Sequence, residues 1–161
     1  MAKVYIMCGK ICSGKSTYSR KLRDEHRAVI LSVDEITLAL FGQDAGDKLD
    51  YYVERTEEYL YAKSLEIVST GIDVVLDWGF WKRSEREYAR DFYSRNGIVC
   101  EFHYIDIDPD EWRRRIAVRN EAVLDHKSDA YYVDDGLAAK FEAIFEKPDR
   151  DEIDVWVDAR D

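Results

Sequence analysis

The sequence predicts an α/β fold in which helices cover both faces of a mostly parallel sheet, and three observations support this fold class. Short apolar segments alternate with polar, helix-forming segments along the chain. No internal repeat or low-complexity linker interrupts that alternation. A glycine-bearing loop separates the first apolar segment from the first polar one. We expect the 161 residues to form a single domain, since domains usually have ~100–200 residues.

The first half of the chain predicts two strands and three helices. Residues 4–7 are a short apolar run and predict a strand, whereas residues 16–26 are polar and helix-forming. Residues 28–33 are again apolar and strand-like, and a short helix is expected over 35–41. Residues 49–69 repeat apolar positions with helical spacing, so they predict one long helix.

The second half continues the same alternation. Residues 72–76 are a nearly continuous β-branched run, which is typical of a buried parallel strand. Pro109 and Pro148 lie at expected element boundaries. The remaining helices and strands are expected at 84–95, 99–107, 110–121, 136–145 and 153–157.

Composition limits the partners. The chain has 24 Lys and Arg against 34 Asp and Glu, and its formal net charge of −10 repels a nucleic-acid backbone. Duplex nucleic acid is therefore disfavoured, whereas a single-stranded 5′ end needs only local positive charge. Three cysteines without metal-ligand spacing favour a reduced cytoplasmic location. We expect no membrane contact, because no apolar run approaches the ~20 residues of a membrane span and no signal region is present.

The loop at residues 9–16 reads Gly-Lys-Ile-Cys-Ser-Gly-Lys-Ser and matches the phosphate-binding pattern G-x-x-x-x-G-K-[ST]. Its glycines let successive N–H groups turn toward phosphate oxygens, and the following helix adds its positive N-terminus. Lys15 is expected to reach the β and γ phosphates of ATP, and Ser16 to offer its hydroxyl to Mg²⁺. The predicted nucleotide-binding residues are Gly9, Cys12, Ser13, Gly14, Lys15, Ser16 and Thr17.

Two alternatives apply to this loop. The first is that the segment is a glycine-rich turn that binds no ligand, although the strand before it and the helix after it favour a nucleotide site. Oxidation of Cys12 could regulate the loop, but a cysteine at such a position is more often a small packing residue.

Two aspartates follow predicted strands. Ligands of open α/β sheets lie beyond the carboxyl ends of the strands, so Asp34 and Asp77 are candidate site residues. A phosphotransferase needs one carboxylate beside the acceptor hydroxyl and another near the metal. We assign Asp34 to catalysis and Asp77 to Mg²⁺, and the residues also allow the reverse assignment. The alternative interpretations are helix capping for Asp34 and capping or turn hydrogen bonding for Asp77.

The helix expected over 110–121 contains four arginines, and Arg115 and Arg119 lie one turn apart on a shared face. Guanidinium groups on a mobile lid can neutralise the charge of a transferring phosphoryl group, so both arginines are predicted to be catalytic. The alternative is an exposed helix face with surface ion pairs, especially for Arg113 and Arg114.

Aromatic and basic residues follow Asp77. Trp78, Phe80 and Trp81 are predicted either to stack on a ring-bearing acceptor or to pack in the core, and packing is favoured for Phe80. Arg83 and Arg86 are expected to bind an anionic acceptor or to pair with nearby acids.

Together these segments resemble small bacterial P-loop kinases of the predicted-kinase group, which are related to polynucleotide kinase domains, zeta toxins and chloramphenicol phosphotransferase. The resemblance implies a P-loop NTPase fold with a five-stranded parallel sheet in the order 2-3-1-4-5, a helical lid at about 110–135, and ATP with Mg²⁺. By position, Asp34 falls where relatives keep the acid that contacts the acceptor hydroxyl, and Arg115 and Arg119 fall on the lid. The phrases that carry the resemblance are GKICSGKST, LSVDEI, VVLDWGFWKRSERE, WRRRIAVRNE and FEKPDRDE.

The expected function is transfer of the γ-phosphoryl group of ATP to a hydroxyl of a small molecule or of a nucleic-acid 5′ end, with the acceptor unidentified. Two alternatives stay open: an ATP-binding regulatory module without phosphotransfer, and a toxin-like nucleotide-sugar kinase. Residues 77–80 also resemble the Asp-Gly-Phe segment of nucleoside monophosphate kinases, but the inserted Trp78 departs from it. A GTPase switch is disfavoured because no Asn-Lys-x-Asp segment occurs. The sequence does not indicate an oligomeric state.

Overall fold

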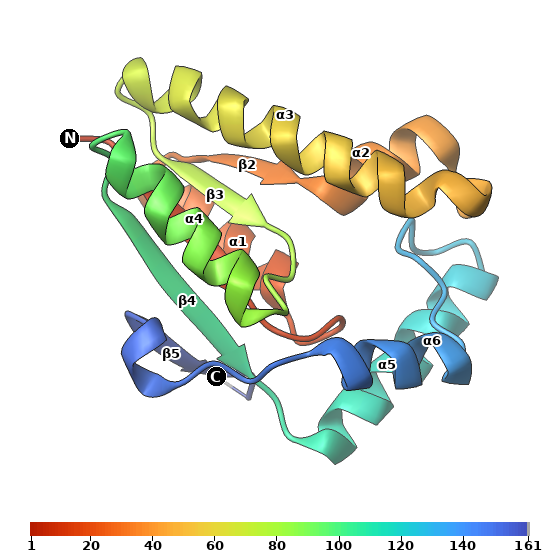
Figure 1. The fold of residues 1–161 in the computed structure, drawn as a ribbon. Helices are drawn as coiled ribbons and strands as arrows, with labels where there is room; N and C mark the ends of the chain where they lie inside the picture. The colour runs from red at the N-terminus through yellow and green to blue at the C-terminus, as the bar shows by residue number, and fades with distance from the viewer. Residues whose placement is uncertain (161) are drawn as a thin grey trace.

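A computed structural model describes residues 1–160 and has the predicted alternation of strands and helices (Figure 1). All strand pairings are parallel, and the spatial order is β2-β3-β1-β4-β5. Both the α/β fold class and the predicted strand order are therefore confirmed. The sheet consists of β1 (Val4–Cys8), β2 (Val29–Ser32), β3 (Val74–Asp77), β4 (Cys100–Asp106) and β5 (Val155–Asp158).

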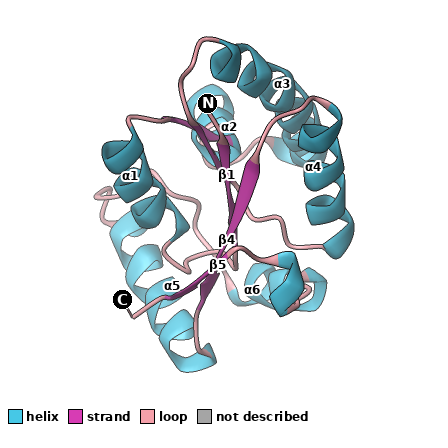
Figure 2. Cartoon of the chain, turned by 90° about the vertical axis from the view of Figure 1, so that its left-hand side faces the viewer, coloured by secondary structure: helices cyan, strands magenta, loops and turns pink. Residues whose placement is uncertain are grey.

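The helices form layers on the two faces of this sheet. Figure 2 shows α1 on one side of the sheet and α3 with α4 on the other. Short 3-10 turns at Gly46–Lys48 and Arg150–Glu152 precede α3 and β5. None of the helices within residues 1–160 is both long enough and apolar enough to cross a membrane. The helices are α1 (Lys15–His26), α2 (Val33–Phe41), α3 (Leu49–Ser69), α4 (Arg83–Arg95), α5 (Pro109–Leu124) and α6 (Asp135–Ile144).

The central strand β1 contributes to a core on each face of the sheet. Successive side chains of a strand point to opposite faces, so Tyr5 packs with Leu22 of α1, whereas Ile6 packs with Tyr61 of α3 and Tyr93 of α4. Every residue of β1 is buried. A strand buried on both faces has no polar side, which explains the uninterrupted apolar run at this point of the sequence.

The boundary between β2 and α2 differs from the prediction. The expected strand at 28–33 ends at Ser32, and the helix begins at Val33 rather than at Glu35. Ser32 is the N-cap, because its hydroxyl accepts a hydrogen bond from the Glu35 N–H at 3.2 Å. The capping interpretation of Asp34 is therefore wrong, and Asp34 lies in the first turn of α2. The Ser-x-x-Glu spacing of a capping box is the signal in the sequence for this start.

Asp77 also differs from its expected position. It is the last residue of β3, where it is paired in register with Ser32 of β2, and the N-cap of α4 is Lys82. The capping interpretation of Asp77 is therefore wrong as well. The pairing of Ser32 with Asp77 places the start of α2 beside the end of β3, at one edge of the sheet.

Candidate functional site

The loop between β1 and α1 receives hydrogen bonds on its carbonyl oxygens. Lys15 Nζ donates to the carbonyls of Gly9 at 3.0 Å and Lys10 at 2.6 Å. The Trp81 indole N–H also donates to the Gly9 carbonyl at 3.2 Å, and the Gly9 N–H donates to the Gly79 carbonyl at 3.1 Å. The segment after β3 therefore fixes the first residue of the phosphate loop.

Helix α5 contacts the same loop from another side. The Trp112 indole N–H donates to the Ile11 carbonyl at 2.6 Å, and Arg115 Nη1 donates to the Ser13 carbonyl at 3.0 Å. A Cβ added to Gly14 would lie only 3.1 Å from Arg115 Nη1. Close approach of α5 thus adds a second reason for glycine at this position, besides its φ of +100°.

With their carbonyls so engaged, the N–H groups of the loop remain available. Within residues 1–160, the backbone N–H groups of Ile11, Cys12 and Gly14 donate no hydrogen bond, and no side chain caps α1. Cys12 and Gly14 both have left-handed backbone conformations, with φ of 59° and 100°. Successive N–H groups in such turns, next to a helix N-terminus, form an anion-binding concavity.

Cys12 is a packing residue in this structure. Its side chain is buried in a cluster with Ile107 and Trp112. Burial raises the pKa of the Cys12 thiol, and the nearby cations Arg119 and Lys15 only partly oppose this effect. A protonated, buried thiol reacts poorly with oxidants, so the structure supports the space-filling interpretation.

A cavity of about 640 Å³ opens beside the loop, at the carboxyl ends of β2 and β3. Ser16, Asp34, Asp77 and Arg119 all line it, so the fold brings four predicted site residues together from four different elements. Asp77 is buried, whereas Asp34 is exposed to solvent at the mouth of the cavity. In the described part of the chain, neither carboxylate accepts a hydrogen bond or forms an ion pair.

The charges in this cavity influence one another. Burial lowers the pKa of Lys15, and the carboxylates of Asp77 and Asp34 oppose this change. The surrounding protein raises the pKa of Asp34, Asp77 adds to this effect, and the cations Lys15 and Arg119 oppose it. Asp34 is therefore a stronger base than an ordinary aspartate, which suits proton transfer at the acceptor.

The two predicted catalytic arginines have different surroundings. Arg115 uses all of its guanidinium nitrogens on the protein: Nε donates to Glu111 at 2.7 Å, Nη1 to the Ser13 carbonyl, and Nη2 to the Ala159 carbonyl at 2.7 Å. Arg119 lines the cavity and has neither a hydrogen bond nor an ion pair to any of residues 1–160. In this structure Arg119 is thus available to a ligand, whereas Arg115 supports the phosphate loop.

The other two arginines of α5 face outward. Arg113 pairs with Asp110 at 3.3 Å, and Arg114 pairs with Glu111 at 2.7 Å, with 64% of each arginine side chain exposed. These are the surface ion pairs of the alternative interpretation.

The three aromatic residues after Asp77 are mainly structural. Phe80 is buried and stacks on Trp78 with ring centroids 5.1 Å apart, and Trp78 also meets Tyr61 edge-on at 5.7 Å. Trp81 packs edge-on against Phe141 at 4.5 Å while its N–H contacts the phosphate loop. Packing therefore explains Phe80, as favoured from the sequence, and loop support explains Trp81.

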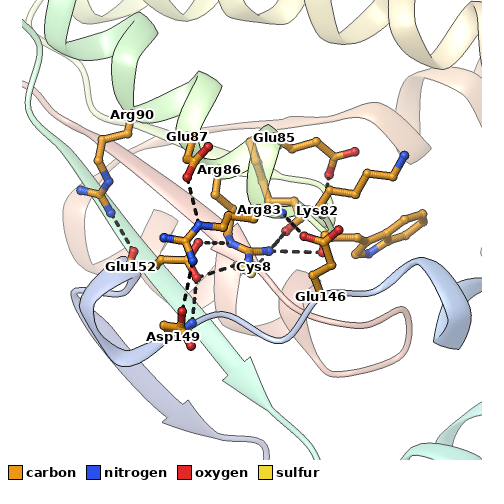
Figure 3. A network of polar contacts seen from close by, with 12 residues as sticks. Cys8, Lys82, Arg83, Glu85, Arg86, Glu87, Arg90, Glu146, Asp149 and Glu152 are labelled. Carbon is orange, nitrogen blue, oxygen red and sulfur yellow. Dashed lines mark hydrogen bonds and ion pairs between the residues drawn. The ribbon is translucent and has the colours of Figure 1, made fainter.

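Arg83 and Arg86 both pair with acids, which decides between their two interpretations (Figure 3). Arg86 is only 3% exposed, and its Nε donates to Glu152 at 2.9 Å. Its Nη1 donates to the carbonyls of Phe80 at 3.0 Å and Trp81 at 3.2 Å. The pair therefore connects the segment before β5 to the residues that contact the phosphate loop.

Arg86→Met is expected to lower the free energy of unfolding by about 3–5 kcal/mol, because it leaves the Glu152 carboxylate, only 12% exposed, without its cationic partner. The Trp81 carbonyl keeps the Glu146 N–H at 2.8 Å, so the lost charge pair is the main cost. Urea denaturation measures this loss. The control is Arg83→Met on the same helix, whose side chain is 52% exposed and which should lose at most about 1 kcal/mol. Adding Glu152→Gln to Arg86→Met should restore part of the stability. Equal losses for Arg83→Met and Arg86→Met would contradict the structural role of Arg86.

Comparison with known proteins gives the following matches. Residues 4–158 match the family model described as "AAA domain". A sugar kinase from Janibacter sp. HTCC2649 has 18% identity and a TM-score of 0.66, covering 100% of this chain and 87% of that chain. An APS kinase from Mycobacterium tuberculosis has 15% identity and a TM-score of 0.68, covering 98% and 88%.

A chain of the Pnkp1/Rnl/Hen1 RNA repair complex has 21% identity and a TM-score of 0.64, covering 91% of this chain and 48% of that chain. At these identities the similarities establish a shared fold. The search of curated proteins found no match.

Proposed function

This chain belongs to the AAA domain family whose model matches residues 4–158, and from this premise we propose that it is an ATP-dependent phosphotransferase. It transfers the γ-phosphoryl group to a hydroxyl of a small molecule or of a nucleic-acid 5′ end. The main support is the cavity in which Ser16, Asp34, Asp77 and Arg119 meet beside the phosphate loop. Further support comes from proteins of the same fold that are described as a sugar kinase, an APS kinase and part of an RNA repair complex.

The phosphate loop binds the nucleotide. The N–H groups of Ile11, Cys12 and Gly14 donate to phosphate oxygens, together with the N-terminus of α1. Lys15 exchanges its hydrogen bonds to two loop carbonyls for the β and γ phosphates. Because the loop N–H groups, the N-terminus of α1 and Lys15 already lie at one place, nucleotide binding requires little backbone movement.

Asp34 accepts the proton of the acceptor hydroxyl. The acceptor oxygen forms a bond to the γ-phosphorus, the bond from that phosphorus to the β–γ bridging oxygen breaks, and ADP leaves. The raised pKa of Asp34 makes its carboxylate better suited to receive the proton. Arg119, which has no protein partner among the described residues, neutralises the equatorial oxygens of the transferring group.

The residues present also fit Mg²⁺. The Ser16 hydroxyl and the Asp77 carboxylate both line the cavity, and Asp77 has no competing hydrogen bond within residues 1–160. Mg²⁺ prefers oxygen ligands and is commonly bound by one or two protein groups together with substrate phosphates. When bound, it would supply positive charge to the β and γ phosphate oxygens. Ser16 and Asp77 would hold it in that position.

The test is a screen with γ-labelled ATP against polynucleotide 5′-hydroxyl ends, sugars, nucleosides, nucleotide sugars and hydroxylated antibiotics. We expect label on one of these classes, and no label when Asp34→Asn replaces the natural protein. One outcome would contradict the proposal and favour a regulatory module: calorimetry shows that ATP binds, but no acceptor becomes labelled and no phosphate is released to water. Label on a nucleotide sugar, with expression toxicity that depends on Asp34, would identify the toxin-like enzyme.

A further inference from the structure

Residues 125–134 connect α5 to α6, and we call this segment the strap. Figure 1 shows it rising from the end of α5, at the right of the view, toward the layer that contains α2 and then returning to α6. Gln43, just after α2, binds the strap with both atoms of its side-chain amide. Its Nε2 donates to the Ala130 carbonyl at 2.8 Å, and its Oε1 accepts from the Tyr132 N–H at 3.1 Å. One side chain thus pairs with the strap backbone as a neighbouring strand would.

A second amide fixes the other end of the strap. Asn120 of α5 donates from Nδ2 to the Val133 carbonyl at 2.5 Å and accepts from the Val133 N–H at 2.7 Å. Val133 is itself only 1% exposed. The strap is therefore attached to α2 on one side and to α5 on the other.

Tyr131 lies between the two residues that Gln43 binds, and it contacts α2 at a buried polar group. The Tyr131 hydroxyl donates to Thr37 Oγ1 at 2.8 Å, and Thr37 Oγ1 donates to the backbone carbonyl of Asp34 at 3.3 Å. Thr37 is fully buried, and Tyr131 lines the same cavity as Asp34. A continuous hydrogen-bond chain therefore runs from the strap to the residue that carries the proposed base.

We propose that Tyr131 is a positioning residue that couples attachment of the strap to the placement of Asp34 in the cavity. The inference rests on the proposed function, since that function makes Asp34 the base. When the strap detaches, Thr37 loses its donor, and the first turn of α2 loses a tertiary constraint. Asp34 is then in the productive position only while the strap covers the site. An enzyme built in this way hydrolyses little ATP when the strap is open.

The state of the strap also changes the environment of the Asp34 carboxylate. Asp129, Ala130 and Tyr131 of the strap line the cavity with Asp34, so detachment of the strap should lessen the desolvation that raises the pKa of Asp34 and lower that pKa toward its ordinary value. The acid limb of a pH–rate profile therefore reports whether the strap is attached. The charged groups that interact with Asp34 or share its cavity are Lys15, Asp77, Arg119, Asp129, Glu35, Arg20 and Arg23.

The test compares Tyr131→Phe with Tyr132→Phe, using MgATP with water as the acceptor. Tyr131→Phe removes one hydroxyl and should lower kcat about tenfold, leave KM for ATP within about twofold, and move the acid limb to lower pH. Tyr132 is 42% exposed, and its hydroxyl makes no hydrogen bond to the described residues, so Tyr132→Phe should match the natural protein. Thr37→Ser keeps the bridging hydroxyl and should retain activity, whereas Thr37→Val should reproduce the effect of Tyr131→Phe.

Hydrogen–deuterium exchange separates failure of this inference from failure of the proposed function. Tyr131→Phe should accelerate exchange in residues 33–41 and 125–134, and Tyr132→Phe should not. If the natural protein transfers no phosphate to any acceptor or to water, the proposed function fails, and Asp34 has no base role to support. Equal kcat, equal acid limbs and equal exchange in the two tyrosine variants would overturn the coupling even if phosphotransfer is established.

Discussion

Replacement of Lys15 by alanine is expected to lower kcat/KM for phosphoryl transfer about 1000-fold, since a preorganised cation at the transferring group is lost. In the structure, Lys15 Nζ lies against the carbonyls of Gly9 and Lys10, at the start of the same loop whose N–H groups are available to phosphate. No other lysine lies in the first turn of α1. Calorimetry with ATP and initial rates with the labelled nucleotide measure the loss.

The fold should survive this change. Burial disfavours the charged form of Lys15, as the lowered pKa of its amine indicates. Replacement of Lys15 by alanine therefore removes a charge that is costly to bury, and the stability of the fold does not depend on that charge. The Gly9 carbonyl keeps the Trp81 N–H, and the Lys10 carbonyl keeps the Ser13 N–H at 3.2 Å. The matched control is Lys21→Ala, an exposed lysine of the same helix. A Lys15→Ala enzyme within tenfold of the Lys21→Ala enzyme would refute the assignment.

Asp34→Asn is expected to reduce phosphoryl transfer roughly 100- to 10,000-fold, the usual range for loss of a general base, while ATP binding persists. The amide preserves the shape of the side chain but cannot accept the acceptor proton. The control is Asp135→Asn, because Asp135 likewise lies in the first turn of a helix, α6, and is exposed without being one of the residues that line the cavity. Both variants lose the same favourable charge at a helix start, so only the Asp34 variant should lose activity.

The same substitution should not destabilise the protein at neutral pH. The pKa of Asp34 is raised on folding, so the native state binds more protons than the unfolded chain above the ordinary aspartate pKa of about 3.8. Stability contributed by this group therefore falls as pH rises through its folded pKa. An amide at this position does not titrate, so Asp34→Asn should remove that dependence, and urea denaturation of the variant at pH 5 and pH 7 measures the change. A loss of stability that grows with pH would be the opposite of this expectation.

Much of the fold follows from local sequence patterns. Residues 4–7 and 74–76 are apolar without alternation because both strands are covered on two faces, and the sequence shows this directly. The long helix expected at 49–69 has the observed bounds. The predicted start of α2 is two residues too late because Val33, the first residue of the helix, also continues the apolar strand pattern. Competing local signals, rather than a missing signal, cause that difference.

The site is harder to predict because its contacts join distant parts of the chain. Helical spacing puts Arg115 and Arg119 on one face, yet Arg115 is engaged by the carbonyls of Ser13 and Ala159, while Arg119 lines the cavity. Tyr131 lies in a polar segment without periodicity, so nothing local indicates its contact with α2. Only the position of Thr37, one helical turn after Asp34, is a signal for that link.

The Arg86–Glu152 pair has a consequence for biosynthesis. The phosphate loop leaves the ribosome before Trp81, whose indole N–H donates to the loop, and before Arg86, which donates to the Trp81 carbonyl. Glu152, the acidic partner of Arg86, is made 66 residues after Arg86. A nascent chain therefore displays the whole phosphate-binding motif well before the supporting ion pair exists. ATP stabilises only molecules in which the loop has its native shape, so nucleotide in the cell shifts the population toward completed, correctly folded copies by mass action.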